Sequence, residues 1–186
     1  MRLHDGEMMT LTRIKQASDP ALGEVWELYR SSFPREERRS WSQHQRAMEE
    51  PSFACLTLRD KEGLAGLLFV WEMEEFAFVE HLAIHPLRRG RGLGHVALNL
   101  LHQRVSPRPV ILEIEPVTDA VTMRRCRFYE SCGYVRLPYP HVQLPFHAGD
   151  APLPMTLMSY PRTINDAEVA VFESCLKEQI MQYRDA

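Results

Sequence analysis

The chain has 186 residues, of which 45% are hydrophobic and 25% are charged. This length suits one domain with one hydrophobic core, and this balance excludes disordered, collagen-like and coiled-coil proteins. The 22 Lys and Arg residues against 25 Asp and Glu residues give a net charge of −3, which does not favour binding to a phosphate backbone. We therefore expect a folded globular domain with no nucleic-acid partner.

The cysteines, histidines and N-terminus bear on metal binding and location. No C-x-x-C pair or H-E-x-x-H spacing occurs, so no metal site is predicted and the four cysteines are expected to be free thiols. The N-terminus has no apolar stretch typical of a secretion signal, and no apolar run approaches the roughly 20 residues of a membrane span. We expect a cytoplasmic location and no membrane partner.

The N-terminal part predicts a strand followed by two helices. Residues 11–16 alternate apolar and polar side chains, as in a half-buried strand. Residues 22–32 place apolar side chains on one helical face, and a second helix at residues 40–49 begins with a capping box formed by Ser40 and Gln43. The charged sequence PREERR at residues 34–39 lies between these helices, and we interpret it as a solvated loop.

The next three strands form a meander. Residues 52–60 and 64–73 are apolar and aromatic-rich, and the turn between them contains Gly63, so they predict a hairpin. Residues 76–85 are the third strand, which Pro86 ends.

The C-terminal part predicts helices and strands in alternation. We expect a helix at 92–104, a strand at 110–115, a helix at 119–132 followed by Gly133, and a last strand at 154–160. A final helix at about 165–184 begins with Asn165 and Glu168 in capping relation and carries an apolar stripe of Val169, Phe172, Leu176 and Ile180. We expect the stripe to pack on the parent domain, with a homodimer contact as the alternative. The whole chain, residues 1–186, is interpreted as one α/β domain with mixed strand directions.

The most informative segment is the Gly-rich turn HPLRRGRGLGH, between a strand and a helix. Glycines let backbone N–H groups approach a ligand closely, and the helix start adds unpaired donors. The glycines are Gly90, Gly92 and Gly94, with Arg88, Arg89 and Arg91 beside them. The segment favours a phosphate or pyrophosphate site over a merely tight connection, and it matches neither a Walker A loop nor the Rossmann fingerprint.

Two motifs resemble the GNAT superfamily of N-acetyltransferases. The acyl-CoA motif R/Q-x-x-G-x-G/A is matched by Arg89, Gly92 and Gly94. The later helical motif F-Y-x-x-x-G-F/Y is matched by FYESCGY, residues 128–134. The resemblance covers about residues 10–160 and leaves the C-terminal helix outside the common core.

This resemblance implies a mixed, mostly antiparallel sheet flanked by helices, and acetyl-CoA as the cofactor. The CoA pyrophosphate would lie on the backbone amides of Arg89, Gly90, Arg91, Gly92, Leu93 and Gly94, and the pantetheine would lie along Leu82 to Ile84. The thioester would lie in a V-shaped opening between this strand and VILEIE. Many members carry an Asn after the latter strand, whereas this chain has EPVTDAVTMRRCR there.

Glu80 is the candidate general base. Alternation along the strand puts it on the face of Phe78 and Leu82, unless a bulge intervenes, and His81 on the other face. Burial among apolar neighbours is expected to raise the pKa of Glu80 toward the range useful for a base. A structural ion pair or a solvated position is the alternative. Glu113 and Glu115, which share one face of the next strand, are the second choice, together with a water chain.

The resemblance gives Tyr129 the role of general acid, and a core aromatic is the alternative. The implied reaction is direct transfer of an acetyl group to a primary amine of a small molecule or peptide. We expect a cationic acceptor, since the nearby carboxylates would attract it, unless Arg124, Arg125 and Arg127 face the cleft and reverse the preference. The rival interpretation is a non-catalytic acyl-CoA-binding or interaction module.

Overall fold

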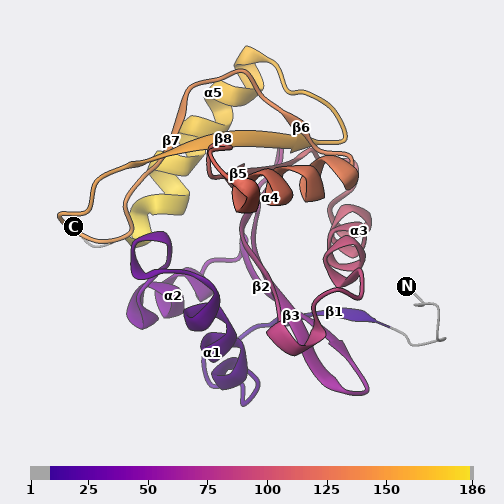
Figure 1. Ribbon diagram of the computed structural model, residues 1–186. Helices are drawn as coiled ribbons and strands as arrows, with labels where there is room; N and C mark the ends of the chain where they lie inside the picture. Colours follow the sequence, from indigo (N-terminus) through magenta and orange to yellow (C-terminus); the bar gives the residue numbers. More distant parts are fainter. Residues whose placement is uncertain (1–8, 185–186) are drawn as a thin grey trace.

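The computed structural model describes residues 9–184, which build one sheet of eight strands with helices on both faces (Figure 1). The strand order is β1-β2-β3-β4-β5-β8-β6, and β7 pairs with β8 outside this path. Among the strands of residues 9–184, only β4 and β5 run parallel; every other pair is antiparallel. The strands are β1 (Thr10–Ile14), β2 (Phe53–Asp60), β3 (Gly63–Glu72), β4 (Ala77–Ile84), β5 (Val110–Ile114), β6 (Val135–Arg136), β7 (His141–Gln143) and β8 (Leu153–Tyr160).

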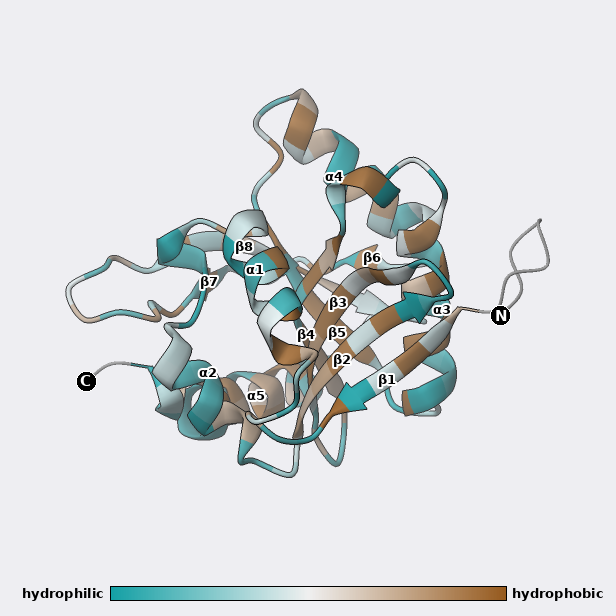
Figure 2. Cartoon of the chain, turned by 90° about the horizontal axis from the view of Figure 1, so that it is seen from below, coloured by the Kyte–Doolittle hydropathy of each residue, from teal (hydrophilic) through white to brown (hydrophobic). Residues whose placement is uncertain are grey.

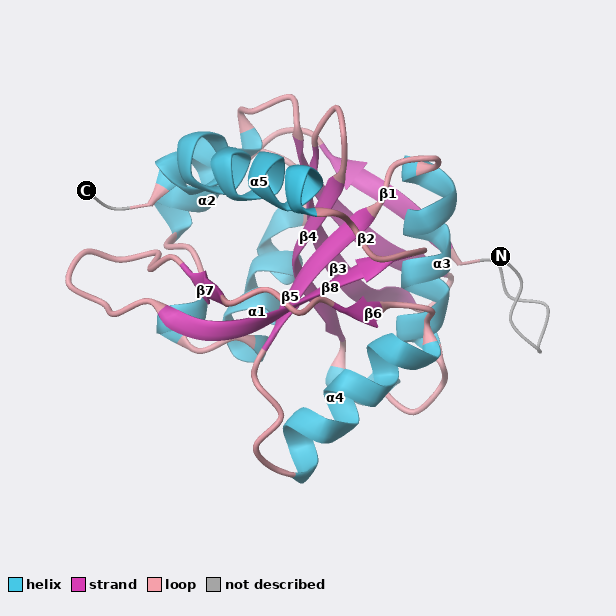
Figure 3. Cartoon of the chain, turned by 90° about the horizontal axis from the view of Figure 1, so that it is seen from above, coloured by secondary structure: helices cyan, strands magenta, loops and turns pink. Residues whose placement is uncertain are grey.

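Five α-helices cover the two faces of the sheet. On one face lie α1 (Leu22–Ser32), α2 (Trp41–Met48) and α5 (Asp166–Cys175); α3 (Leu93–Val105) and α4 (Ala120–Ser131) lie on the other (Figures 1 and 3). Each face has its own hydrophobic cluster, and hydrophobic residues concentrate on the central strands (Figure 2). Within the described residues, no helix is both long and apolar enough to span a membrane.

The capping residues and the hairpin turn behave as their sequences predict. Ser40 and Gln43 form a reciprocal capping box at the start of α2, and Asn165 and Glu168 do the same at the start of α5. Gly63 adopts a φ of 105° in the β2–β3 turn, which a side chain would disfavour. The predicted meander of β2, β3 and β4 is confirmed.

The C-terminal stripe packs on the protein's own sheet, as we expected. Its side chains are all buried in the cluster that also contains α1 and α2: Val169, Phe172, Leu176 and Ile180. The helix changes at its end, because α5 continues as a wider π-helical turn at Leu176–Ile180 and a 3₁₀ turn at Met181–Tyr183. Strands β6 and β7 escaped prediction, since two and three residues are too few to show a period.

The interpretation of PREERR as a solvated loop is wrong for its last residue. Arg35–Glu37 form a 3₁₀ turn, after which the Arg39 side chain enters the protein with 0% exposure. Burying a guanidinium requires a partner, and here the partner is a carboxylate on β4. Hydrophobic periodicity carries no information about such a long-range pair.

A β-bulge in β4 changes which side chains face α1 and α2. Phe69 of β3 pairs with His81, whereas the next residue, Val70, pairs with Val79, so Glu80 is the additional residue. After this point the alternation shifts by one position, and Glu80 and His81 face the same side of the sheet. The prediction that His81 faces away from Glu80 is therefore wrong, and Leu82 rather than His81 lies on the opposite face.

His44 on α2 is fully buried and held only by packing. Neither ring nitrogen has a hydrogen-bond partner among the described residues, and the ring packs against Trp26, Tyr29, Phe53 and Phe69. Burial, with Arg39 nearby, lowers the pKa of His44 to about 3. The imidazole is therefore neutral in the folded protein across the ordinary pH range.

This lowered pKa predicts a loss of stability in acid. Because the unfolded chain binds a proton at His44 near pH 6.5 and the folded chain does not, the stability contributed by neutral His44 falls as the pH drops below about 6.5. Between pH 7 and pH 5 we expect this group to cost about 2 kcal/mol of unfolding free energy. Urea denaturation of wild type and His44→Phe at both pH values measures it. Equal pH dependence in the two proteins would contradict this assignment.

Candidate active site

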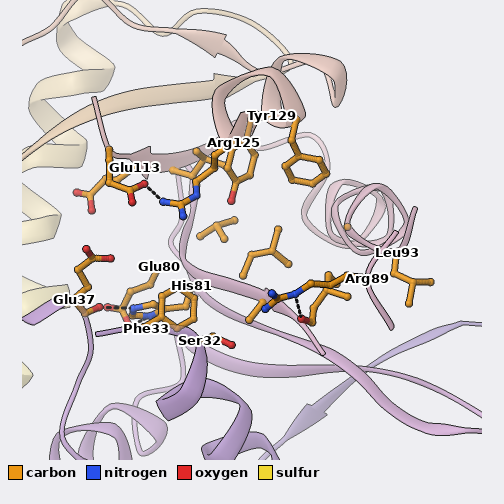
Figure 4. A pocket seen from close by; sticks show the side chains of 18 of the residues that line it. Ser32, Phe33, Glu37, Glu80, His81, Arg89, Leu93, Glu113, Arg125 and Tyr129 are labelled. Carbon is orange, nitrogen blue, oxygen red and sulfur yellow. Dashed lines mark hydrogen bonds and ion pairs between the residues drawn. The ribbon is translucent and has the colours of Figure 1, made fainter. Parts of the chain in front are cut away.

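A cleft of about 790 Å³ opens where β4 and β5 part (Figure 4). The two strands pair only at Ala77–Val79 with Val110–Leu112. Beyond these pairs β4 continues beside β3, and β5 continues beside β8. The cleft walls come from residues 79–84 of β4, from β5, from the Gly-rich loop, from α4 and from the segment between α1 and α2.

One end of the cleft is the N-terminus of α3. Gly92 is the N-cap with a φ of 72°, and no side chain in the described part of the chain caps the helix. The N–H groups of Gly92, Leu93, Gly94 and His95 have no acceptor within the helix. A Cβ at Gly92 would meet nothing within 4 Å, so the backbone here is open to a ligand. This end suits an anion, because the donors and the positive end of the helix dipole point the same way.

Gly94 has a second role in the same loop. A Cβ at this position would come within 2.8 Å of the Phe128 ring, so α3 and α4 can approach only because residue 94 is glycine. His95 also contacts Phe128 edge-to-face, and its Nε2 lies 3.0 Å from the Ser131 hydroxyl. The two motifs found in the sequence thus touch each other in the fold.

The arginines of the loop differ in their placement. Arg89 lines the cleft, and its Nε donates to the Ile84 carbonyl at 3.1 Å. Arg88 forms an ion pair with Asp60, whose pKa is lowered chiefly by this hydrogen bond. Arg91 lies outside the cleft lining, with its guanidinium 3.6 Å from Glu62. Of these three arginines, only Arg89 therefore lines the cleft.

Tyr129 stands on the α4 side of the cleft and points into it (Figure 4). Burial raises the pKa of its phenol to about 12. The hydroxyl keeps its proton at neutral pH, and the raised pKa makes it a weaker acid than an ordinary tyrosine, so it can donate only to a group that becomes strongly basic during a reaction. Tyr134, from the same motif, lies outside the cleft and is 3.0 Å from His102 Nε2.

Glu80 lines the cleft but is held in a buried ion pair. The Arg39 guanidinium donates to it through Nη2 at 2.6 Å and through Nε at 3.1 Å, and the Trp71 indole donates at 3.1 Å. The two charged side chains are 0% and 4% exposed. Arg39 also donates to the Ile180 carbonyl at 3.0 Å, so this pair connects the α1–α2 segment, β4 and the C-terminal turn.

The prediction that burial would raise the pKa of Glu80 is wrong in direction. Burial alone would raise it, but the charge and hydrogen bonds of Arg39 and His81 outweigh this effect and lower the pKa well below its usual range. A carboxylate with these partners is a weak proton acceptor. The geometry therefore favours the alternative of a structural ion pair at Glu80.

The two carboxylates of β5 are also paired. Glu113 accepts from His141 Nε2 at 2.5 Å, while His141 Nδ1 lies 2.6 Å from Glu173 on α5. Burial would lower the pKa of His141, but the hydrogen bonds with Glu113 and Glu173 raise it. Glu115 forms an ion pair with Arg125 at the edge of the cleft. Of Arg124, Arg125 and Arg127, only Arg125 lines the cleft.

The cleft contains most of the predicted site residues and several that the sequence did not reveal. The predicted residues that line it are Glu80, Leu82, Ile84, Arg89, Gly90, Gly92, Leu93, Gly94 and Tyr129. Residues that sequence reasoning missed include Glu37, Gln143 and Met155 in the lining and Arg39 and His141 behind it. They come from loops, short strands and strand ends, where no local pattern marks them.

The matched family model identifies the class of protein. Residues 22–134 match the acetyltransferase (GNAT) family. The matched segment contains both sequence motifs and ends at Tyr134. The chain belongs to this family. The similar protein "Putative acetyltransferase YjbC" of Bacillus subtilis (strain 168) is 33% identical over 100 residues, which is 53% of this chain and 50% of YjbC. The match thus spans about half the length of that relative.

Solved structures share the fold. A structure described as "Putative acetyltransferase from GNAT family" from Bacteroides thetaiotaomicron superposes with a TM-score of 0.82 at 27% identity, over 90% of this chain and 97% of that chain. An aminoglycoside 6'-N-acetyltransferase complexed with coenzyme A gives a TM-score of 0.58 at 18% identity, over 84% and 99% of the two chains. The ribosomal-protein-S18-alanine N-acetyltransferase of Escherichia coli gives 0.57 at 19%, over 85% and 96%.

The ion pair at Glu80 predicts a loss of stability when one partner is removed. Glu80→Gln leaves the buried Arg39 charge without its counterion, so we expect the unfolding free energy to fall by about 3 kcal/mol. The double variant Arg39→Met with Glu80→Leu removes both charges and should recover most of this loss. Urea denaturation of the single and double variants measures the coupling.

Activity of the same variants tests the predicted role of Glu80 as a base. If the pair is structural, acetyl transfer should recover together with stability in the double variant. A folded, stable double variant whose turnover stays strongly reduced and whose remaining activity has lost the acidic limb of its pH profile would instead support Glu80 as the base.

Proposed function

We propose that this protein transfers an acetyl group from acetyl-CoA to a primary amine. The observation that carries the proposal is the combination, in one cleft, of an uncapped helix N-terminus at Gly92 and a protonated phenol at Tyr129. The first binds an anion, and the second donates a proton. The family membership and the fold shared with an acetyltransferase complexed with coenzyme A support the same conclusion.

The cleft has the features that acetyl-CoA requires. The open backbone at Gly90 and Gly92 and the guanidinium of Arg89 suit a pyrophosphate. Among the described residues, no strand lies beside the edge of β4 that faces the cleft beyond Val79, so its backbone groups are available to the amides of a pantetheine arm along Leu82 to Ile84. Acetyl-CoA supplies the activated thioester.

The residues of the chain then serve binding, orientation and proton transfer. A backbone N–H of the unpaired β4 edge stabilises the carbonyl oxygen of the acetyl group as negative charge develops on it. The amine nitrogen would form the new bond to the acetyl carbon as the carbon–sulfur bond breaks, and Tyr129 would give its proton to the departing sulfur. The acylated nitrogen then loses its remaining extra proton, which restores the Tyr129 hydroxyl and leaves a neutral amide and a free thiol. The proton of the ammonium passes to water in the open cleft, since Glu80, Glu113 and Glu115 are each held by a cation.

Substitution at the Gly-rich loop tests the cofactor site. Gly92→Asp places a side chain and a negative charge where the pyrophosphate would lie, so we expect CoA affinity to fall by about 100-fold or more. Isothermal titration calorimetry with CoA gives the affinity. Gly149→Asp is the matched control, because Gly149 has a similar φ of 84° with open space around it but lies outside the cleft. Unchanged affinity in folded Gly92→Asp would refute this placement.

Removal of the Tyr129 hydroxyl tests the proton donor. Tyr129→Phe keeps the ring and its packing, and we expect kcat to fall by about 100-fold while CoA affinity stays the same. The control is Tyr134→Phe, which removes a buried hydroxyl of the same motif that faces His102 instead of the cleft. Release of free CoA thiol over a panel of amines provides the rate. CoA binding without any amine-dependent thiol release would favour the non-catalytic module.

A further inference from the structure

Three of the four carboxylates that line the cleft have a cationic partner. Glu80 pairs with Arg39, Glu115 with Arg125, and Glu113 with His141. Because Glu173 holds the other nitrogen of His141, that group of three contains two carboxylates and one imidazolium. Glu80, Glu113 and Glu115 therefore each have a cationic partner, while the Glu113–His141–Glu173 group keeps one net negative charge.

Glu37 is the exception. It lines the cleft from the 3₁₀ turn between α1 and α2, and among residues 9–184 its carboxylate has no hydrogen bond or ion pair. The arginines of the same segment are directed elsewhere. Arg35 pairs with Asp150 at 3.0 Å, Arg38 donates to the Phe33 carbonyl at 3.2 Å, and Arg39 pairs with Glu80.

The position of Glu37 is fixed by its backbone. Its carbonyl lies 2.8 Å from His81 Nε2, which anchors the turn to β4 inside the cleft. Figure 4 shows its side chain pointing toward the wall that carries Glu113, at the end of the cleft away from the Gly-rich loop. The two ends of the cleft thus carry opposite charges. Arg89 and the α3 N-terminus lie at one end, and the unpaired Glu37 carboxylate lies at the other.

We propose that Glu37 is an acceptor-binding residue that selects amines carrying a second positive charge. This inference rests on the proposed function, since it assigns the Gly-rich end to acetyl-CoA and the Glu37 end to the acceptor. The reacting amine must lose its proton before it attacks, so it gives up its charge. A second ammonium keeps its charge throughout, and the Glu37 carboxylate binds it with a charge-assisted hydrogen bond. Diamines and polyamines have this chemistry.

Three amines of similar length test the proposal: cadaverine, with a second ammonium; pentylamine, with a methyl end; and aminocaproate, with a carboxylate end. For wild type we expect kcat/KM to be about 10- to 100-fold higher for cadaverine than for pentylamine, and lowest for aminocaproate. In Glu37→Gln the advantage of cadaverine should fall to within a few-fold. Thiol release measures all three.

Glu36→Gln is the matched control, since Glu36 is the adjacent carboxylate in the same turn but is exposed and outside the cleft lining. It should keep the wild-type preference. A preference for cadaverine that survives in Glu37→Gln, or a wild type that prefers aminocaproate, overturns the proposal while leaving acetyl transfer intact.

Calorimetry separates this inference from the proposed function, because it needs no turnover. Cadaverine is titrated into wild type and Glu37→Gln, each saturated with CoA. We expect cadaverine affinity to fall by about 10-fold or more in the variant, and pentylamine affinity to stay the same. If these affinity changes are found but no amine causes thiol release, the acetyltransferase proposal is refuted, while Glu37 is supported as the cation site. Equal cadaverine affinities would overturn the role of Glu37.

Discussion

The short pairing of β4 with β5 is the constraint on which the site depends. The chain that connects two adjacent parallel strands must leave the sheet and return through a crossover, and here the crossover contains α3. Because the strands are bonded at only three residue pairs and then diverge, the cleft opens inside the sheet, beside the end of β4 from which the chain enters α3. The uncapped start of α3 therefore lies at one end of the cleft. Tyr129 reaches it from α4, whose approach to α3 depends on the absence of a side chain at Gly94.

The ion pair of Arg39 and Glu80 fixes the other wall of this cleft. The bulge in β4 puts Glu80 and His81 on one side of the sheet, so that Glu80 can receive Arg39 while His81 reaches the Glu37 carbonyl. Two contacts from adjacent residues then hold the α1–α2 segment against β4. A buried pair of this kind adds little net stability compared with apolar residues, but the loss of one member strongly destabilises the folded protein. The directed hydrogen bonds of the pair fix the position of the α1–α2 segment relative to β4. An apolar contact between the same segments has no such directional requirement.

Local sequence patterns predict most helices and strands of this fold. They do not predict the charge state of Glu80 or the side of the sheet on which His81 lies, because these depend on contacts between distant residues. Capping boxes, alternation and glycine turns are properties of neighbouring residues, so α1, α2 and the meander could be predicted within a residue or two. The start of α5 was predicted equally well, but its α-helical part ends at Cys175, well before the predicted end near residue 184. The Gly-rich loop and Tyr129 were found through motifs. In contrast, the charge state of Glu80 depends on Arg39, which lies 41 positions earlier in the chain. The bulge that reverses the side of His81 leaves no mark in the sequence of β4 itself.

The C-terminal helix lies outside the part of the chain matched by the family model, yet its charges reach the cleft. His141 has an acceptor at each nitrogen, which requires the imidazolium form, and this explains how its pKa rises despite burial. Glu173 of α5 thereby holds His141 of β7, and His141 holds Glu113 of the cleft wall. The last helix thus determines whether Glu113 faces the cleft as a free carboxylate or as one already bound to a cation. A change in this helix would therefore alter the charge at Glu113 without touching the Gly-rich loop at the other end of the cleft.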